Sequence, residues 1–224
     1  ARGSGCALLG GDTTRTPEVQ GRHAPVTISI TAMGDLPAGM GLTRKGAKPG
    51  DDIWVSGTVG DAYAALKCRW GAWSVMPDLE PELFARMDRP TPRIALGQAL
   101  LGAASAVADI SDGLLADLGH ILERSGVSAE IEWEKIPTSV ALQSMTPARQ
   151  HEAALAGGDD YELIFTAPPS SAERIYEAGL LSGTPVTRIG RVIERTSRAV
   201  TVRTPDGRPV LLVTEGFDHF RNEE

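Results

Sequence analysis

The sequence has few cysteines and no excess of basic residues, and both absences narrow the classes of protein to which it can belong. Cys6 and Cys68 form neither a CxxC pair nor the spacing of a zinc site, which fits a reducing compartment such as the cytosol. Asp and Glu number 29 against 22 Lys and Arg, which gives a formal net charge of -7. This balance argues against a nucleic-acid partner, because binding to the phosphate backbone depends on basic side chains.

Long apolar runs are also missing. The most apolar window, residues 94–110, is interrupted by Gln98, by two glycines and by Asp109, so it does not suit a membrane span. No signal segment with a charged and then an apolar part opens the chain. The sequence contains no P-loop and no GxSxG motif. We therefore predict a cytoplasmic protein without a membrane partner.

The length of 224 residues is sufficient for one large or two small domains with a sizeable core. Residues 34–50 are rich in Gly and Pro and carry Arg44, Lys45 and Lys48, so we place a domain boundary there, with residues 1–40 before it and 41–224 after it. The chain begins at Ala1 without a methionine and continues at once into an apolar segment. We expect it to be a piece of a longer protein.

The most informative stretch is residues 105–118, SAVADISDGLLADL. An apolar run passes through a turn into a helical pattern, which predicts a strand, a sharp turn and a helix. Asp109 and Asp112 bracket the turn, so both carboxylates could face one Mg²⁺ ion, and the N–H groups that begin the helix favour phosphate. A purely structural interpretation stays open, with Ser111 as the N-cap, Asp112 beside the helix dipole and Asp117 facing solvent.

Two more acidic stretches follow paired glycines. GGDTTR, residues 10–15, comes after a short apolar run that we interpret as a buried strand, and GGDDYELIFT, residues 157–166, leads into an apolar strand. Either could be an ordinary polar turn, and Gly157 could be a helix C-cap. Three acids within residues 159–162, beside a buried strand, are costly unless they are paired, hydrated or bound to metal.

Several further elements are predicted from periodicity. Strict alternation over residues 26–33 predicts a half-buried strand. Other predicted strands and helices are the strands at 53–55, 129–133 and 186–193, a hairpin at 199–213 turned by residues 205–207, and helices at 93–103, 137–155 and 169–178. No nucleophile pairs with His120 or His219 in the sequence, so we interpret both as structural.

Four motifs occur in one order along the chain: GGDTTR at 10–15, ADISDGLLADLGHI at 108–121, GGDDYELIFT at 157–166 and GFDHF at 216–220. Together they resemble the bacterial thiamine-monophosphate kinases, of the aminoimidazole ribonucleotide synthetase-like superfamily. The resemblance implies an α+β fold of two domains, of which the N-terminal one is only partly present. Residues 1–40 would be the remnant of an N-terminal ATP-binding and dimerisation domain, and 41–224 a C-terminal α+β domain.

The activity implied by the resemblance is the ATP-dependent phosphorylation of thiamine monophosphate to thiamine diphosphate, the last step of thiamine diphosphate biosynthesis. The transfer would be direct and in line, within a cytoplasmic homodimer. The acceptor phosphate is already ionised, so no catalytic base is assigned, and the charge is balanced by bound Mg²⁺. On the family pattern, Asp12, Asp109 and Asp112 match magnesium ligands.

The family pattern also assigns ligand contacts. The matching ATP contacts are Gly11, Asp12, Arg44 and Ser111, and the matching substrate contacts are Glu162 and Phe217. The family's N-terminal acidic motif of GDDAA type has no counterpart in this sequence, so we expect the 224-residue chain alone to be inactive. The alternatives are another ATP-using enzyme of the superfamily and a homologue that binds nucleotide or thiamine phosphate without catalysis.

Overall fold

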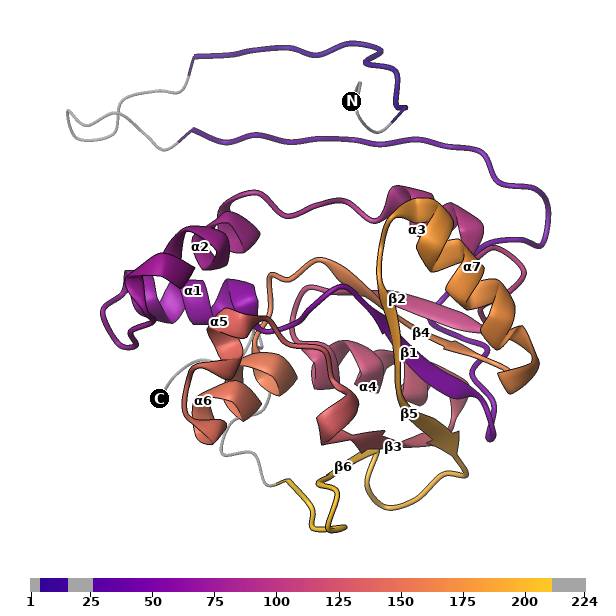
Figure 1. Ribbon diagram of the computed structural model, residues 1–224. Helices are drawn as coiled ribbons and strands as arrows, with labels where there is room; N and C mark the ends of the chain where they lie inside the picture. Colours follow the sequence, from indigo (N-terminus) through magenta and orange to yellow (C-terminus); the bar gives the residue numbers. More distant parts are fainter. Residues whose placement is uncertain (1–4, 16–25, 211–224) are drawn as a thin grey trace. The chain divides into compact units, whose positions relative to one another are not determined.

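The protein was analysed as a computed structural model that describes residues 5–15 and 26–210. The chain divides into two compact units, Ala1–Met40 and Gly41–Glu224. Among the described residues, every helix and strand belongs to the second unit. Figure 1 shows these elements, coloured along the sequence.

The strands predicted for residues 6–9 and 26–33 do not form, and this part of the prediction was wrong. The described residues of the first unit are assigned to no helix or strand. The side chains that alternate on one face, Val26, Ile28 and Ile30, are 83%, 79% and 87% exposed. A half-buried strand needs a paired neighbour and a core to cover its apolar face, and the described residues of the first unit supply neither.

The second unit begins its regular structure just after the Pro49-Gly50 turn. Its strands are β1 (Asp52–Ser56), β2 (Ala106–Ile110), β3 (Ser128–Glu132), β4 (Glu162–Ala167), β5 (Val186–Ile193) and β6 (Val200–Arg203). Its α-helices are α1 (Asp61–Arg69), α2 (Glu80–Asp88), α3 (Ile94–Ala99), α4 (Leu114–Ser125), α5 (Val140–Gln143), α6 (Pro147–His151) and α7 (Ala172–Ser182). Short helical turns are η2 (Pro77–Leu79), η3 (Trp133–Lys135), η4 (Glu152–Ala156) and η5 (Pro169–Ser171).

The described strands form one six-stranded sheet in the order β2-β4-β1-β5-β3-β6. The pairs from β2 to β3 are antiparallel, and β3 pairs with β6 in parallel. The strands predicted around residues 53–55, 129–133 and 186–193 are confirmed. Of the hairpin predicted at 199–213, the turn and an antiparallel bridge between Arg203 and Pro209 are present, and residues 211–213 lie outside the described range.

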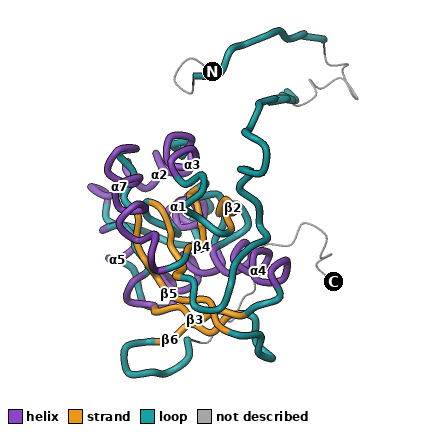
Figure 2. The backbone as a smooth tube through the Cα atoms, turned by 90° about the vertical axis from the view of Figure 1, so that its right-hand side faces the viewer, coloured by secondary structure: helices purple, strands orange, loops and turns teal. Residues whose placement is uncertain are grey.

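Both faces of the sheet are covered, as the side chains of β1 illustrate. Ile53 and Val55 belong to one buried cluster, and Trp54, between them, belongs to another. Figures 1 and 2 view the molecule from directions at right angles to each other. In both, the sheet lies between α4 on one side and α3 and α7 on the other. The mixture of an antiparallel-rich sheet and packed helices confirms the α+β class.

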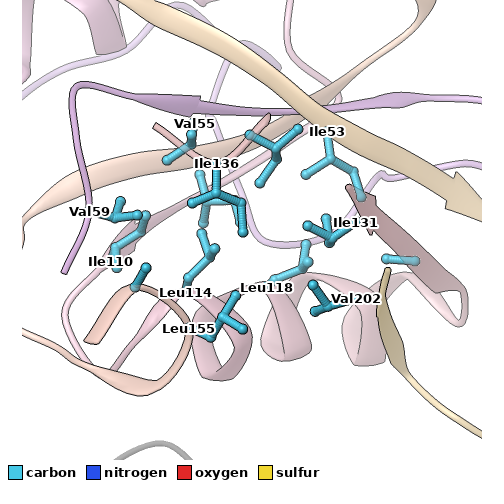
Figure 3. Close-up of a cluster of buried hydrophobic side chains, with 14 of the residues drawn as sticks. Ile53, Val55, Val59, Ile110, Leu114, Leu118, Ile131, Ile136, Leu155 and Val202 are labelled. Atoms are coloured by element: carbon cyan, nitrogen blue, oxygen red, sulfur yellow. The ribbon is translucent and has the colours of Figure 1, made fainter. Parts of the chain in front are cut away.

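Helix α4 carries the apolar stripe predicted from the sequence. Leu114, Leu118, Ile121 and Leu122 are 0% exposed and pack under the sheet, as Figure 3 shows for the first two. The helix ends at Gly126, whose left-handed φ of 69° suits a glycine C-cap. Replacing one of these Leu or Ile side chains by Ala would cost about 2–5 kcal/mol of unfolding free energy. The start of α4, where the site lies, is thus fixed to the core.

Candidate active site

Two of the acidic motifs meet at one edge of the sheet. Strand β2 pairs antiparallel with β4, with Ile110 opposite Glu162, so the end of β2 lies beside the beginning of β4. Two further backbone hydrogen bonds extend this pairing into the loops, from Asp159 N to Ser111 O at 2.9 Å and from Tyr161 N to Ile110 O at 2.8 Å. Figure 1 shows β2 and β4 adjacent. We call residues 109–113 the first acidic loop and residues 157–161 the second.

The first acidic loop joins β2 to α4, so the predicted strand, turn and helix are confirmed. Asp109 is exposed, and Ser111 and Asp112 are half-buried. The helix cap differs from the expected one: the N-cap residue is Gly113, with φ of 126°, and no N-cap side chain accepts a hydrogen bond. Ser111 therefore does not cap the helix, and this structural interpretation was wrong.

Asp117, one turn inside α4, holds the loop that precedes the helix. Its Oδ2 accepts hydrogen bonds from the N–H groups of Ser111, Asp112 and Gly113, at 3.0, 3.0 and 3.2 Å. Asp117 is only 1% exposed, so the expectation that it faces solvent was wrong. These three N–H groups precede the first helical residue, Leu114, so a phosphate at the N–H groups that begin the helix stays a prediction. Burial raises the pKa of Asp117, the three hydrogen bonds lower it and the neighbouring charge of Asp112 raises it.

Asp112, Asp117 and His120 form an acidic cluster with one potential ligand atom each. These atoms lie within 4.8 Å of one another. The Oδ1 atom of Asp117 is buried and has no hydrogen-bond partner among the described residues. His120, which the sequence led us to interpret as structural, is exposed at this position. The three-residue interval between Asp117 and His120 on a helix was the signal that could have grouped them.

The second acidic loop is held in a strained backbone conformation. Asp159 and Tyr161, both exposed, have φ values of 66° and 51°, in the left-handed region that non-glycine residues rarely adopt. Such residues cost about 1–3 kcal/mol each and concentrate at functional sites. Gly158 touches the carbonyl of Ser111 so closely that a Cβ atom would collide with it.

The Tyr161 hydroxyl lies among the carboxylates of both loops. It donates a hydrogen bond to Asp159 Oδ1 at 3.1 Å. Burial raises the pKa of Tyr161, and the negative charges of Asp159, Asp109 and Asp112 raise it further. The second loop therefore adds an exposed carboxylate and a phenol to the acidic edge formed by the first loop.

Asp160 faces the opposite way and caps α1. It is 2% exposed, and its carboxylate accepts hydrogen bonds from Gly60 N at 2.6 Å and Ala62 N at 3.2 Å. Burial raises the pKa of Asp160 to about 7, against the lowering effect of these hydrogen bonds. Asp160 therefore ties the second acidic loop to the start of α1.

Glu162, which the family pattern matches to a substrate contact, is fully buried. Its carboxylate accepts hydrogen bonds from Ser56 Oγ at 2.5 Å, from Arg86 Nη2 at 2.8 Å, and from Arg93 through Nε at 2.7 Å and Nη2 at 2.5 Å. Its contact with substrate stays a prediction, because in this structure both oxygens are engaged by protein donors. The exposed carboxylate of the GGDDYE motif belongs to Asp159, which the sequence did not single out.

The remaining predicted residues are distributed over the chain. Arg44 is exposed, forms no ion pair with any described acid, and follows Thr43, whose carbonyl accepts a hydrogen bond from Val107 N in β2. Gly11 and Asp12 are exposed in the first unit, where Asp12 Oδ1 accepts a hydrogen bond from Thr13 N at 2.8 Å. Phe217 lies outside the described residues. The structure thus brings together Asp109, Ser111 and Asp112.

The first acidic loop has the donors that a hard divalent cation requires. Asp109 and Asp112 offer carboxylate oxygens from an exposed and a half-buried position, and the Asp117 carboxylate lies behind them. Oxygen donors of this kind suit Mg²⁺. Two open hollows, of about 430 and 630 Å³, lie around α7 and the start of β5, and neither is lined by residues of the acidic loops. No helix in the described part of the chain is long and apolar enough to cross a membrane.

The fold and the two loops define the class of this protein. Residues 48–203 match the family described as AIR synthase related protein, C-terminal domain, and the chain belongs to this family. Curated relatives of the chain include thiamine-monophosphate kinases. That of Haemophilus influenzae is 40% identical over 219 residues, which cover 97% of this chain and 64% of the relative. That of Escherichia coli K12 is 40% identical over 215 residues, which cover 95% and 63%.

Solved structures show the same relationship. The thiamine-monophosphate kinase of Stenotrophomonas maltophilia K279a is 41% identical with a TM-score of 0.69, over 78% of this chain and 56% of that one. AaThiL complexed with AMPPCP and TMP is 38% identical with a TM-score of 0.64, over 80% and 54%. Escherichia coli HypE, a hydrogenase maturation protein, shares the fold at 23% identity and a TM-score of 0.63. The chain spans less than two thirds of the length of these relatives.

Proposed function

We propose that this chain is part of a thiamine-monophosphate kinase, which transfers the γ-phosphoryl group of ATP to thiamine monophosphate. Support comes from curated relatives of that activity at 40% identity over nearly the whole chain. A relative at 38% identity has been solved with AMPPCP, an ATP analogue, and TMP. The hydrogenase maturation alternative rests on a 23% identical fold neighbour and has no comparable support.

The observation that carries the proposal is the meeting of the two acidic loops. A kinase of this type needs carboxylates grouped at a rigid edge, where they can hold the cations that accompany two phosphate-bearing substrates. Asp109 and Asp112 stand at the end of β2, and the N–H groups of Asp159 and Tyr161 attach the second loop to the first. The grouping explains how an acidic edge can belong to a phosphate site.

Magnesium is the proposed cofactor, and Asp12, Asp109 and Asp112 are its proposed ligands. Bound Mg²⁺ would neutralise negative charge on the phosphates. The carboxylates of Asp109 and Asp112 would hold the cation from the loop that joins β2 to α4. Gly11, Asp12, Arg44 and Ser111 are the proposed ATP contacts, and the exposed Arg44 has no described acid to neutralise it.

For the second substrate, Glu162 and Phe217 remain the proposed contacts, and we add Asp159. The Asp159 carboxylate is exposed, whereas that of Glu162 is held by Arg86 and Arg93. A carboxylate at Asp159 suits the cationic thiazolium or the amino group of the pyrimidine of thiamine monophosphate. We further propose that the complete protein is a cytoplasmic homodimer.

The reaction balances without a general base. A phosphate oxygen of thiamine monophosphate attacks the γ-phosphorus of ATP, the bond from that phosphorus to the β-phosphate oxygen breaks, and ADP leaves with the electron pair. The attacking oxygen carries no proton near neutral pH, so none has to be removed. The work of the protein is therefore alignment and charge balance, and no catalytic residue in the acid–base sense is assigned.

The test is a kinase assay on the full-length protein with thiamine monophosphate, ATP and Mg²⁺. We expect thiamine diphosphate to form, and Asp109→Asn and Asp112→Asn to lower kcat/KM by about 100-fold or more, as for loss of a charge-stabilising group. Asp88→Asn, an exposed variant on α2, serves as the control and should keep full activity. Binding of both ligands by a folded protein without turnover would favour the non-catalytic homologue. The 224-residue chain alone should be inactive.

A further inference from the structure

Asp117 is a buried carboxylate with a single set of partners. Its Oδ2 atom accepts hydrogen bonds from three consecutive main-chain N–H groups, those of Ser111, Asp112 and Gly113. Its Oδ1 atom is buried and has no hydrogen-bond partner within residues 5–15 and 26–210. All polar contacts of this side chain in the described structure are therefore made to the first acidic loop.

This arrangement is unfavourable as a simple contribution to stability. A buried carboxylate with one oxygen unsatisfied is costly, since the group loses hydration that the protein does not fully replace. Burial raises its pKa, and the charge of Asp112 acts in the same direction. A buried group that lowers the stability of the fold is expected where its side chain contributes to a functional site.

The geometry indicates what Asp117 does for the site. Between Asp109 and Leu114 the chain must leave a strand and start a helix, and it carries two aspartates, Asp109 and Asp112, whose negative charges both raise the pKa of Tyr161. Gly113, with its φ of 126°, supplies the turn, and convergence of three N–H groups on one oxygen fixes the peptide planes around Asp112. A ligand-bearing loop fixed by outer hydrogen bonds is the usual requirement of a metal site.

We propose that Asp117 is a positioning residue of the cation site, which holds the first acidic loop so that Asp109 and Asp112 bind one divalent cation. The inference rests on the proposed function, because the cation site is proposed there. Asp117 acts through the loop and not by removing or donating a proton. The hydrogen-bond acceptor at this position, and not the negative charge, is what the loop requires.

The test measures Mn²⁺ binding to the full-length protein by electron paramagnetic resonance, without nucleotide or substrate. Asp117→Ala removes the acceptor and should weaken Mn²⁺ affinity by about 10-fold or more, the range known for outer-shell partners of metal sites. Asp117→Asn keeps a carbonyl oxygen for the loop and should stay within about threefold of the wild type. Ser139→Ala, which removes the N-cap of α5 away from the loop, controls for lost stability and should not change Mn²⁺ affinity.

Four results would overturn the assignment of Asp117. Unchanged Mn²⁺ affinity in Asp117→Ala would remove the positioning role, and equal losses in Asp117→Ala and Asp117→Asn would make the charge the essential feature. A wild-type protein that binds no Mn²⁺, or whose Mn²⁺ affinity is unaffected by Asp112→Asn, would instead overturn the proposed cation site, and the role of Asp117 with it.

A measurement on the wild type alone keeps the proposal testable if a variant does not fold. In the metal-free protein, the amides of Ser111, Asp112 and Gly113 should be protected from hydrogen exchange, although two of them precede the helix and its N-cap residue. Exchange at the rate of an open loop would contradict the assignment. Asp117→Asn, if folded, should retain this protection.

Discussion

The N–H group of Asp159 donates a hydrogen bond to the carbonyl oxygen of Ser111 at 2.9 Å, and this contact joins two motifs that are far apart in the sequence. Ser111 lies between the two aspartates of the first acidic loop, and Asp159 is the exposed acid of the second. Gly158 makes the approach possible, because its Cα atom is close to the same carbonyl. The site is thus held together by main-chain atoms, and side-chain changes that keep these backbones in place should leave it assembled.

Gly158→Ala should separate the two loops. An added Cβ atom meets the carbonyl of Ser111, a backbone group that cannot move aside without shifting the loop. We expect lower thermal stability and weaker Mn²⁺ binding in the full-length variant. Gly119→Ala is the matched control: Gly119 lies within α4 with open space around it, so alanine should raise helix stability by about 0.5–1 kcal/mol and leave Mn²⁺ binding unchanged. Equal metal affinity in the two variants would contradict this prediction.

Glu162→Ala should cost far more stability than removal of an exposed acid. Glu162 is fully buried and pairs with Arg86 and Arg93. In the variant both guanidinium groups lose this carboxylate, and Arg86 keeps a contact of 4.0 Å with Asp61. We expect urea denaturation to report a loss of about 3–5 kcal/mol in unfolding free energy, the range for breaking a buried ion pair. Asp88→Ala breaks an ion pair of similar geometry to Arg69 at the surface and should shift the urea midpoint much less. Similar shifts of the urea midpoint in Glu162→Ala and Asp88→Ala would mean that the buried ion pairs of Glu162 add no more stability than the exposed one.

Asp160 should make stability fall with rising pH. Its pKa is about 7 in the folded protein against 3.8 for an unperturbed aspartate, so between these values the native state binds a proton that the unfolded chain has released. The unfolding free energy therefore declines as pH rises from about 4 to 7, by a total on the order of 4 kcal/mol. In Asp160→Asn this pH dependence disappears. The unfolding free energy of the variant should therefore rise relative to that of the wild type as pH increases across this range. A stability difference independent of pH would contradict the assignment.

Asp88, whose pKa is lowered in the folded protein and not raised, provides a control for this pH dependence. The ion pair with Arg69 lowers the pKa of Asp88, so its contribution is present above the unfolded pKa and is lost as pH falls. Asp88→Asn should therefore not reproduce the gain of Asp160→Asn between pH 4 and 7. Denaturant titrations at several pH values would separate the two behaviours.

Divalent cations should stabilise the folded full-length protein through Asp109 and Asp112. A cation that binds only the native state, at about 100 times its dissociation constant, adds about 2.7 kcal/mol to the unfolding free energy. Thermal unfolding with and without Mg²⁺ should show this increase in the wild type and not in Asp109→Asn or Asp112→Asn. The same Mg²⁺-dependent increase in unfolding free energy in all three proteins would mean that the cation does not bind at Asp109 and Asp112.

The first acidic loop could be predicted because its signals are local. An apolar run, a turn with Gly113 and the periodic Leu and Ile residues of α4 specify strand, turn and helix without reference to the rest of the chain. The role of Asp117 could not be deduced in the same way. Capping residues normally precede a helix, whereas Asp117 reaches back from inside it to N–H groups four to six positions earlier.

The acids of the second loop could be grouped from the sequence but not told apart. Asp159, Asp160 and Glu162 are chemically similar, and their burial depends on partners that lie far away in the chain. Glu162 finds Arg86 and Arg93 at separations of 76 and 69 residues, and Asp160 finds Gly60 N at a separation of 100. Only the sheet pairing brings these partners together, so the sequence could not show which of these carboxylates is exposed.

The order of the strands also affects how the chain reaches this structure. No two neighbours in the sheet are consecutive in sequence, and β1 lies between β4 and β5, both of which are made more than a hundred residues later. During synthesis from the N-terminus, strand β1 is therefore made well before the two strands with which it pairs, and its side chains Ile53, Trp54 and Val55 stay uncovered until then. Such distant pairing slows folding and leaves apolar strands open to aggregation. The acidic loops require β2 and β4 together, so the active site can assemble only late in folding.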